Sequence, residues 1–316
     1  MLNGVNKPHA TLQSYRFHLP ALLSLSGVLT FMAAESISIF SLIKKLRLAI
    51  AALLLAIALG VSVSGQRALH ISQDYYYYLL TDYKASLHRL EKTYDLTIDY
   101  EVGPEFIDEK GRAAPINGKA VPLDELGIAR FSKILPKVLA LYPPDVIKNN
   151  LKAIKLSKEV WFYGVRYGAS AIDHTVYLTD SGREEGFTDF YISQTFHHEL
   201  SSVLMRNHAF PTQTWLDANP PDVKYQTDFE NYLKSIAQDR DLKGNDYFYQ
   251  RGVMSKYSYS TLENDFNLYA QTVFNEPVRM KMLINQYPRI KTKYEILKAF
   301  YLSISPKFST VFERIG

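Results

Sequence analysis

Cysteine is absent from this 316-residue sequence. Without cysteine the chain can form no disulfide bond and can bind no metal through a thiolate, so the available metal ligands are histidine, aspartate and glutamate. The absence also excludes a lipid anchor of the kind that is attached to a cysteine at a signal-peptide cleavage site. Any metal centre in this protein must therefore be built from nitrogen and oxygen ligands.

The chain also lacks a surplus of charge once its first 65 residues are set aside. Residues 1–65 contain five basic side chains and one acidic side chain, which leaves 31 of each sign in residues 66–316. A nucleic-acid-binding protein usually presents a basic face, and the composition of residues 66–316 supplies none. The same residues contain no internal repeat and no low-complexity linker. We therefore expect one domain, residues 66–316, that does not bind nucleic acid.

Residues 42–65 have the pattern of an export signal. The basic stretch 42–47 precedes an uncharged apolar run, 48–63, with small residues at its end. This order is typical of a secretory signal peptide or an N-terminal membrane anchor, and the run is long enough to span a bilayer if it is not cleaved. A buried core helix is the alternative interpretation. We expect an exported protein, periplasmic or associated with the cell envelope, with residues 1–65 as extension and signal or anchor.

The remaining residues predict an α+β domain with a small mixed sheet and a mostly helical C-terminal half. Apolar residues recur at helical spacing in some segments and alternate as in strands in others. The expected helices cover 74–90, 126–141, a segment from about Tyr191 and most of the chain after Pro211, and the expected strands cover 97–102, 158–167 and 175–179. We expect Thr175–Thr179 to be an edge strand, beside which an extended substrate could lie.

One helix carries half of a zinc-peptidase motif. His198-Glu199 matches the opening of HExxH, in which the first histidine binds Zn²⁺ and the glutamate takes a proton from the zinc-bound water. Position 202, where the second histidine belongs, is Ser202. The apolar stripe of this helix is formed by Phe196, Leu200, Val203 and Leu204. His198 and Ser202 fall on the opposite face, so the alternative interpretation is a surface His-Glu pair with no function.

Two later residues are candidates for a further metal ligand. His208 follows His198 by ten residues, the separation of the outer histidines in HExxHxxGxxH, although Met205 stands where that pattern has glycine. Glu263 begins a later helix, as the acidic ligand of a His-His-Glu zinc site would. The segment Ser260–Glu263 also matches a capping box, in which Glu263 would only tie down the helix N-terminus. Asp265 is a reserve candidate.

Three segments together resemble a known family. Residues 197–207, residues 215–225 with their Asn-Pro-Pro sequence, and residues 263–266 are similar to zinc-binding metallopeptidases of Bacteroidetes, which are exported or lipoprotein, gluzincin-like proteins. The similarity runs from about residue 70 to the C-terminus. It departs from the family pattern at Ser202.

The resemblance implies a zincin-like domain with one Zn²⁺, His198 as ligand, Glu199 as general base and an acid around Glu263 as a further ligand. The implied activity is hydrolysis of a peptide or protein substrate through glutamate-assisted attack of zinc-bound water. Because Ser202 replaces a histidine, the alternative is a catalytically inactive zincin-fold module that binds or assembles partners in the cell envelope. Residues 42–65 could associate either form with the membrane.

Overall fold

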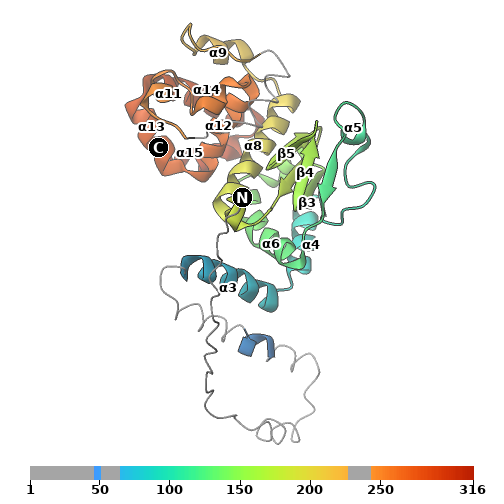
Figure 1. The fold of residues 1–316 in the computed structure, drawn as a ribbon. Coiled ribbons are helices and arrows are strands. Elements are labelled where there is room, and N and C mark those ends of the chain that lie inside the picture. Colours follow the sequence, from blue (N-terminus) through green and yellow to red (C-terminus); the bar gives the residue numbers. More distant parts are fainter. Residues whose placement is uncertain (1–45, 51–64, 227–242) are drawn as a thin grey trace, which may run out of the picture. The chain divides into compact units, whose positions relative to one another are not determined.

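The computed structural model of the protein describes residues 46–50, 65–226 and 243–316 (Figure 1). The chain divides into two units, residues 1–50 and 51–316. Residues 46–50 of the first unit are helical, and most of the predicted signal or anchor lies outside the described residues. Among the residues that are described, no helix is both long and apolar enough to cross a membrane. The domain boundary expected at residue 65 stays a prediction.

The second unit is an α+β domain, as the sequence predicts. Its first half contains two small sheets and the helices α3 (Gly65–Leu80), α4 (Tyr83–Tyr94), α5 (Glu109–Arg112), α6 (Glu125–Leu139) and α7 (Pro144–Asn150). Its second half is helical, with α8 (Asp189–Asn207), α9 (Thr212–Asp217), α11 (Asp246–Gln250), α12 (Leu262–Asn275), α13 (Pro277–Gln286), α14 (Pro288–Ile304) and α15 (Ser309–Glu313). The helix expected at 74–90 is two helices, because the Asp82 side chain accepts a hydrogen bond from Ala85 N and begins α4 there.

The larger sheet contains parallel and antiparallel pairs. Its strands lie in the order β1 (Thr97–Asp99), β3 (Ala153–Ser157), β7 (Thr175–Thr179) and β6 (Ala169–Ile172). The first three strands are parallel, and β6 runs antiparallel to β7. The expectation that Thr175–Thr179 is an edge strand is therefore wrong. A turn at Asp173, with a positive φ of 48°, folds Ala169–Ile172 back onto β7 and makes β6 the edge.

The smaller sheet differs from the prediction of a single strand at 158–167. It consists of β2 (Lys119–Val121), β4 (Glu159–Phe162) and β5 (Val165–Tyr167). The single strand expected at 158–167 is a hairpin, because Tyr163 and Gly164 both have positive φ, as a tight two-residue turn requires. Val160 and Phe162 of β4 are buried while Trp161 is 37% exposed, so this strand has one buried face.

Helix α8 lies between the sheet and the C-terminal helices (Figure 1). It contacts β6 and β7 on one side and α12 along its length on the other. Its predicted apolar stripe is fully buried: Phe196, Leu200, Val203 and Leu204 are all 0% exposed. Burying such a side chain contributes about 1.5–3 kcal/mol to stability, so the stripe fixes the orientation of the motif helix.

Candidate functional site

The face of α8 that carries the His-Glu motif is covered as well. The helix begins at Thr188, whose hydroxyl accepts a hydrogen bond from Tyr191 N at 3.1 Å. Ser202 is only 3% exposed, and His198 is partly buried, because α12 packs against this side. The interpretation of this face as solvent-exposed surface is therefore wrong.

A row of polar side chains joins α8 to α12, and we call it the α8–α12 seam. Its members are His198, Ser201 and Ser202 on α8 and Asn264, Asn267 and Gln271 on α12. Asn267 accepts a hydrogen bond from the Ser201 hydroxyl at Oδ1, 2.5 Å away, and donates one from Nδ2 to Ser202 Oγ, 2.6 Å away. Buried polar groups need such partners, so Ser202 acts here as a packing and hydrogen-bonding residue.

His198 uses both ring nitrogens within the seam. Its Nδ1 lies 3.0 Å from Gln271 Oε1 and its Nε2 lies 3.2 Å from Asn264 Oδ1. Burial lowers the pKa of His198 by more than its hydrogen bonds and the charge of Glu263 raise it, so the ring is neutral. A neutral imidazole has one N–H donor and one acceptor. Both facing atoms are amide oxygens, so one of the two amides must present its NH₂ group instead; because Asn264 Nδ2 donates to Ser260 Oγ, we assign this orientation to Gln271.

These contacts do not fit a zinc site. Zinc needs a free lone pair on each ligating nitrogen and, in catalytic sites, three protein ligands at about 2.0–2.2 Å. Both ring nitrogens of His198 lie against amide groups of α12, and Ser202 Oγ accepts a hydrogen bond from Asn267. In residues 46–50, 65–226 and 243–316, no group of three or more histidine, aspartate or glutamate side chains could hold a metal. Zinc binding would require the seam to open.

The two further ligand candidates are engaged in other contacts. The Glu263 carboxylate pairs with Arg206 at 2.8 Å, and His208 Nε2 lies 3.0 Å from Asn150 Oδ1. His198 and His208 are ten residues apart along α8 and its C-cap, which separates them by about 15 Å. Two ligands of one zinc ion stand no more than about 4 Å apart, so His208 is not brought to His198.

The helix cap is also resolved. Thr261, not Ser260, begins α12, and its hydroxyl accepts a hydrogen bond from Asn264 N at 2.9 Å. The helix cap therefore lies one residue later than the capping box predicted at Ser260–Glu263. The reserve ligand Asp265 is fully buried in an ion pair with Lys293, at 2.6 Å.

Glu199 and Tyr257 complete the surroundings of His198. Glu199 is partly buried on α8, and its role as general base stays a prediction. The Tyr257 ring lies beside the imidazole, with 6.2 Å between ring centroids. A cavity of about 180 Å³ next to the seam is bordered by Gln194, Gln271 and Ser255. This volume is below the 300–1,000 Å³ that is usual for small-molecule sites.

Sequence reasoning missed the α12 half of the seam. Asn264, Asn267 and Gln271 recur at intervals of three and four residues, which places them on one face of a helix. A stripe of amides on a helix that is otherwise apolar was the available signal for a buried polar interface.

Comparison with known proteins gives one distant structural similarity. The crystal structure of a "putative zinc-binding metallo-peptidase" from Bacteroides caccae is similar with a TM-score of 0.47 and 17% sequence identity, over 73% of this chain and 90% of that one. No protein-family model matches the sequence, and no curated protein matches it either. The resemblance at family level is therefore distant, and no residue role is transferred from it.

Proposed function

We propose that this protein is an inactive, zincin-like binding or assembly module of the cell envelope. The observation that carries the proposal is the α8–α12 seam, in which His198 and Ser202 serve as hydrogen-bonding partners of α12. A zincin would need the residues at these two positions as metal ligands. Replacing the second histidine by a serine that Asn267 holds turns a metal-binding helix into a packed interface.

A zinc-dependent peptidase is the second candidate, and the retained Glu199 next to His198 favours it. In that case His198 would have to leave Gln271 and bind zinc, and Glu263 would have to leave Arg206 if it were a further ligand. The two candidates therefore differ in one measurable property, the affinity of the folded chain for zinc.

We expect the purified chain to bind no zinc at micromolar free metal, as measured by isothermal titration calorimetry and metal analysis after dialysis. His198→Ala should leave this result unchanged but lower the free energy of unfolding by about 1–3 kcal/mol, because two buried amides lose a partner. His88→Ala is the matched control, since His88 is 67% exposed and should change stability little.

Stoichiometric zinc binding that His198→Ala abolishes would overturn the proposal. Hydrolysis of a peptide library by the wild-type chain but not by Glu199→Gln would then establish the peptidase.

We also propose, from the composition of residues 42–65, that the protein is exported. N-terminal sequencing of the protein from fractionated cells tests this, and recovery from the cytosol with an intact N-terminus would contradict it.

A further inference from the structure

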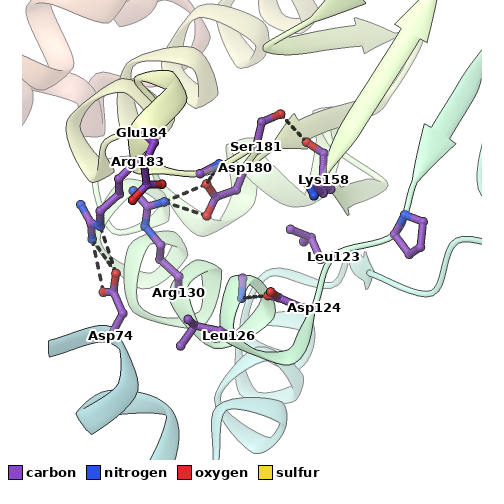
Figure 2. A pocket seen from close by; sticks show the side chains of 13 residues that line it. Asp74, Leu123, Asp124, Leu126, Arg130, Lys158, Asp180, Ser181, Arg183 and Glu184 are labelled. Carbon is purple, nitrogen blue, oxygen red and sulfur yellow. Dashed lines mark hydrogen bonds and ion pairs between the residues drawn. The ribbon is translucent and has the colours of Figure 1, made fainter. Parts of the chain in front are cut away.

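A second cavity, of about 380 Å³, opens at the carboxyl ends of two parallel strands (Figure 2). Lys158 directly follows β3, Asp180 directly follows β7, and the start of α6 forms the facing wall. Ligands of parallel sheets bind in crevices outside the carboxyl ends of the strands. The volume also falls within the range of small-molecule sites. None of the residues that line this cavity belongs to the α8–α12 seam.

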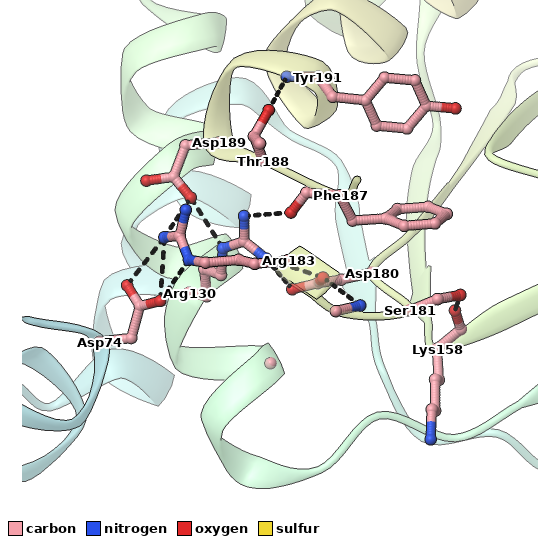
Figure 3. A network of polar contacts seen from close by, with 12 residues as sticks. Asp74, Arg130, Lys158, Asp180, Ser181, Arg183, Phe187, Thr188, Asp189 and Tyr191 are labelled. Atoms are coloured by element: carbon pink, nitrogen blue, oxygen red, sulfur yellow. Dashed lines mark hydrogen bonds and ion pairs between the residues drawn. The ribbon is translucent and has the colours of Figure 1, made fainter. Parts of the chain in front are cut away.

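One wall of the cavity is a fixed network of charges (Figure 3). Arg130 is 5% exposed, contacts both carboxylate oxygens of Asp180 at 2.7 and 2.8 Å, and donates to Asp189 at 2.7 Å. Arg183 pairs with Asp74 of α3 and with Asp189. Counting Lys133 beside Asp74, three basic and three acidic groups balance each other. The network as a whole carries no net charge.

Three other charged residues line the cavity, and all three are exposed. Over the described ranges, the ammonium group of Lys158 and the carboxylate of Glu184 form no hydrogen bond or ion pair. Asp124 uses one carboxylate oxygen to accept a hydrogen bond from Gly127 N at 2.8 Å. The apolar side chains of the lining are those of Pro122, Leu123 and Leu126. Figure 2 shows Leu123, Asp124 and Leu126 across the cavity from Asp180 and Ser181.

We propose that this cavity binds a zwitterionic ligand, a free α-amino acid with an apolar side chain or a short peptide of the same kind. The ligand carboxylate pairs with Lys158, its ammonium group with Glu184 and Asp124, and its side chain packs on Leu123 and Leu126. A ligand that carries both charges can pair with lining groups of both signs, whereas a ligand with one charge can pair with one kind alone. The inference rests on the proposed binding function and gives that function a ligand class.

Isothermal titration calorimetry of the full-length chain tests the proposal with L-leucine and Leu-Leu. We expect both to bind, and we expect N-acetyl-leucine and leucinamide, which lack the ammonium and the carboxylate charge respectively, to bind at least about tenfold more weakly. Lys158→Met should weaken the binding of leucine at least about tenfold, and Glu184→Gln should also weaken it. Lys152→Met is the matched control, because Lys152 is an exposed lysine just before the other end of β3, and should leave affinity unchanged.

Three results would overturn the proposal. The first is that neither leucine nor Leu-Leu binds at concentrations up to about 10 mM. The second is that N-acetyl-leucine and leucinamide bind with the same affinity as leucine. The third is that a folded Lys158→Met variant binds leucine with unchanged affinity. Thermal unfolding of each variant establishes that it is folded. The zinc titration described above is a separate measurement. Failure of leucine to bind, with no zinc bound either, would remove this ligand class and leave the inactive module standing.

Discussion

Replacing Lys293 with methionine should lower the free energy of unfolding by about 3–5 kcal/mol. Lys293 and Asp265 are both 0% exposed and lie 2.6 Å apart, between α14 and α12. The same Asp265 oxygen accepts hydrogen bonds from Trp215 Nε1 at 3.1 Å and from the Tyr225 hydroxyl at 2.6 Å. Methionine fills a similar volume but carries no charge, so it would leave an uncompensated carboxylate in the core.

Urea unfolding of the variant measures this effect, and two controls isolate it. Lys291→Met removes an exposed lysine from the same helix and should change stability by less than about 0.5 kcal/mol. The double variant Asp265→Asn with Lys293→Met should recover most of the loss, since no net charge stays buried. A loss under about 1 kcal/mol in Lys293→Met would show that the pair is solvated in solution and would contradict the buried cluster.

Acidification should destabilise the protein through His197. This residue is 0% exposed, stacks on Phe274 with 5.2 Å between ring centroids, and lies 2.9 Å from the Tyr142 hydroxyl through Nδ1. Burial, with a smaller effect of Arg314, lowers the pKa of His197 from 6.5 to about 3. The folded state therefore excludes a proton that the unfolded state binds below about pH 6.5. The stability that the neutral ring contributes is complete above that pH and is lost as the pH falls toward 3.

At pH 4.5 this loss should amount to about 3 kcal/mol relative to pH 7.5, because each unit below 6.5 costs about 1.4 kcal/mol. The control is the double variant Tyr142→Phe with His197→Phe, which keeps the aromatic packing and removes both polar partners together. Between pH 7.5 and pH 4.5, the free energy of unfolding of this variant should fall by about 3 kcal/mol less than that of the wild type. Equal pH dependence of the two proteins would show that His197 becomes protonated in the folded state.

The sequence predicts α8 and its buried stripe well, because Phe196, Leu200, Val203 and Leu204 recur at helical spacing. It predicts the opposite face badly. His198 and Ser202 are polar, and a polar helix face is more often covered by water than by another helix. Only the matching amides of α12 make burial of this face possible, and their pairing depends on a contact between residues that are more than sixty positions apart.

The order of the strands could not be predicted from the sequence for a related reason. Alternation of apolar residues identifies 175–179 as a strand but does not say which strands flank it. The flanking position of β6 is decided by a turn at Asp173, and that of β3 by pairing with a segment that begins at Ala153. Glu263 is a similar case, since an acid at a helix start can cap, bind metal or pair with a base. The proximity of Arg206 selects the ion pair.

The sequence by itself determined the α+β class, the exclusion of thiolate metal sites, the neutrality of residues 66–316 and the place of the His-Glu motif on a helix. These follow from composition and from periodicity along one segment, which are local properties of the chain. Tertiary structure alone decided that Ser202 and His198 meet Asn267 and Gln271 and that Lys158 borders a cavity. Metal ligation and ligand binding need atoms within about 2–3 Å of each other, and separate segments reach that distance only through packing.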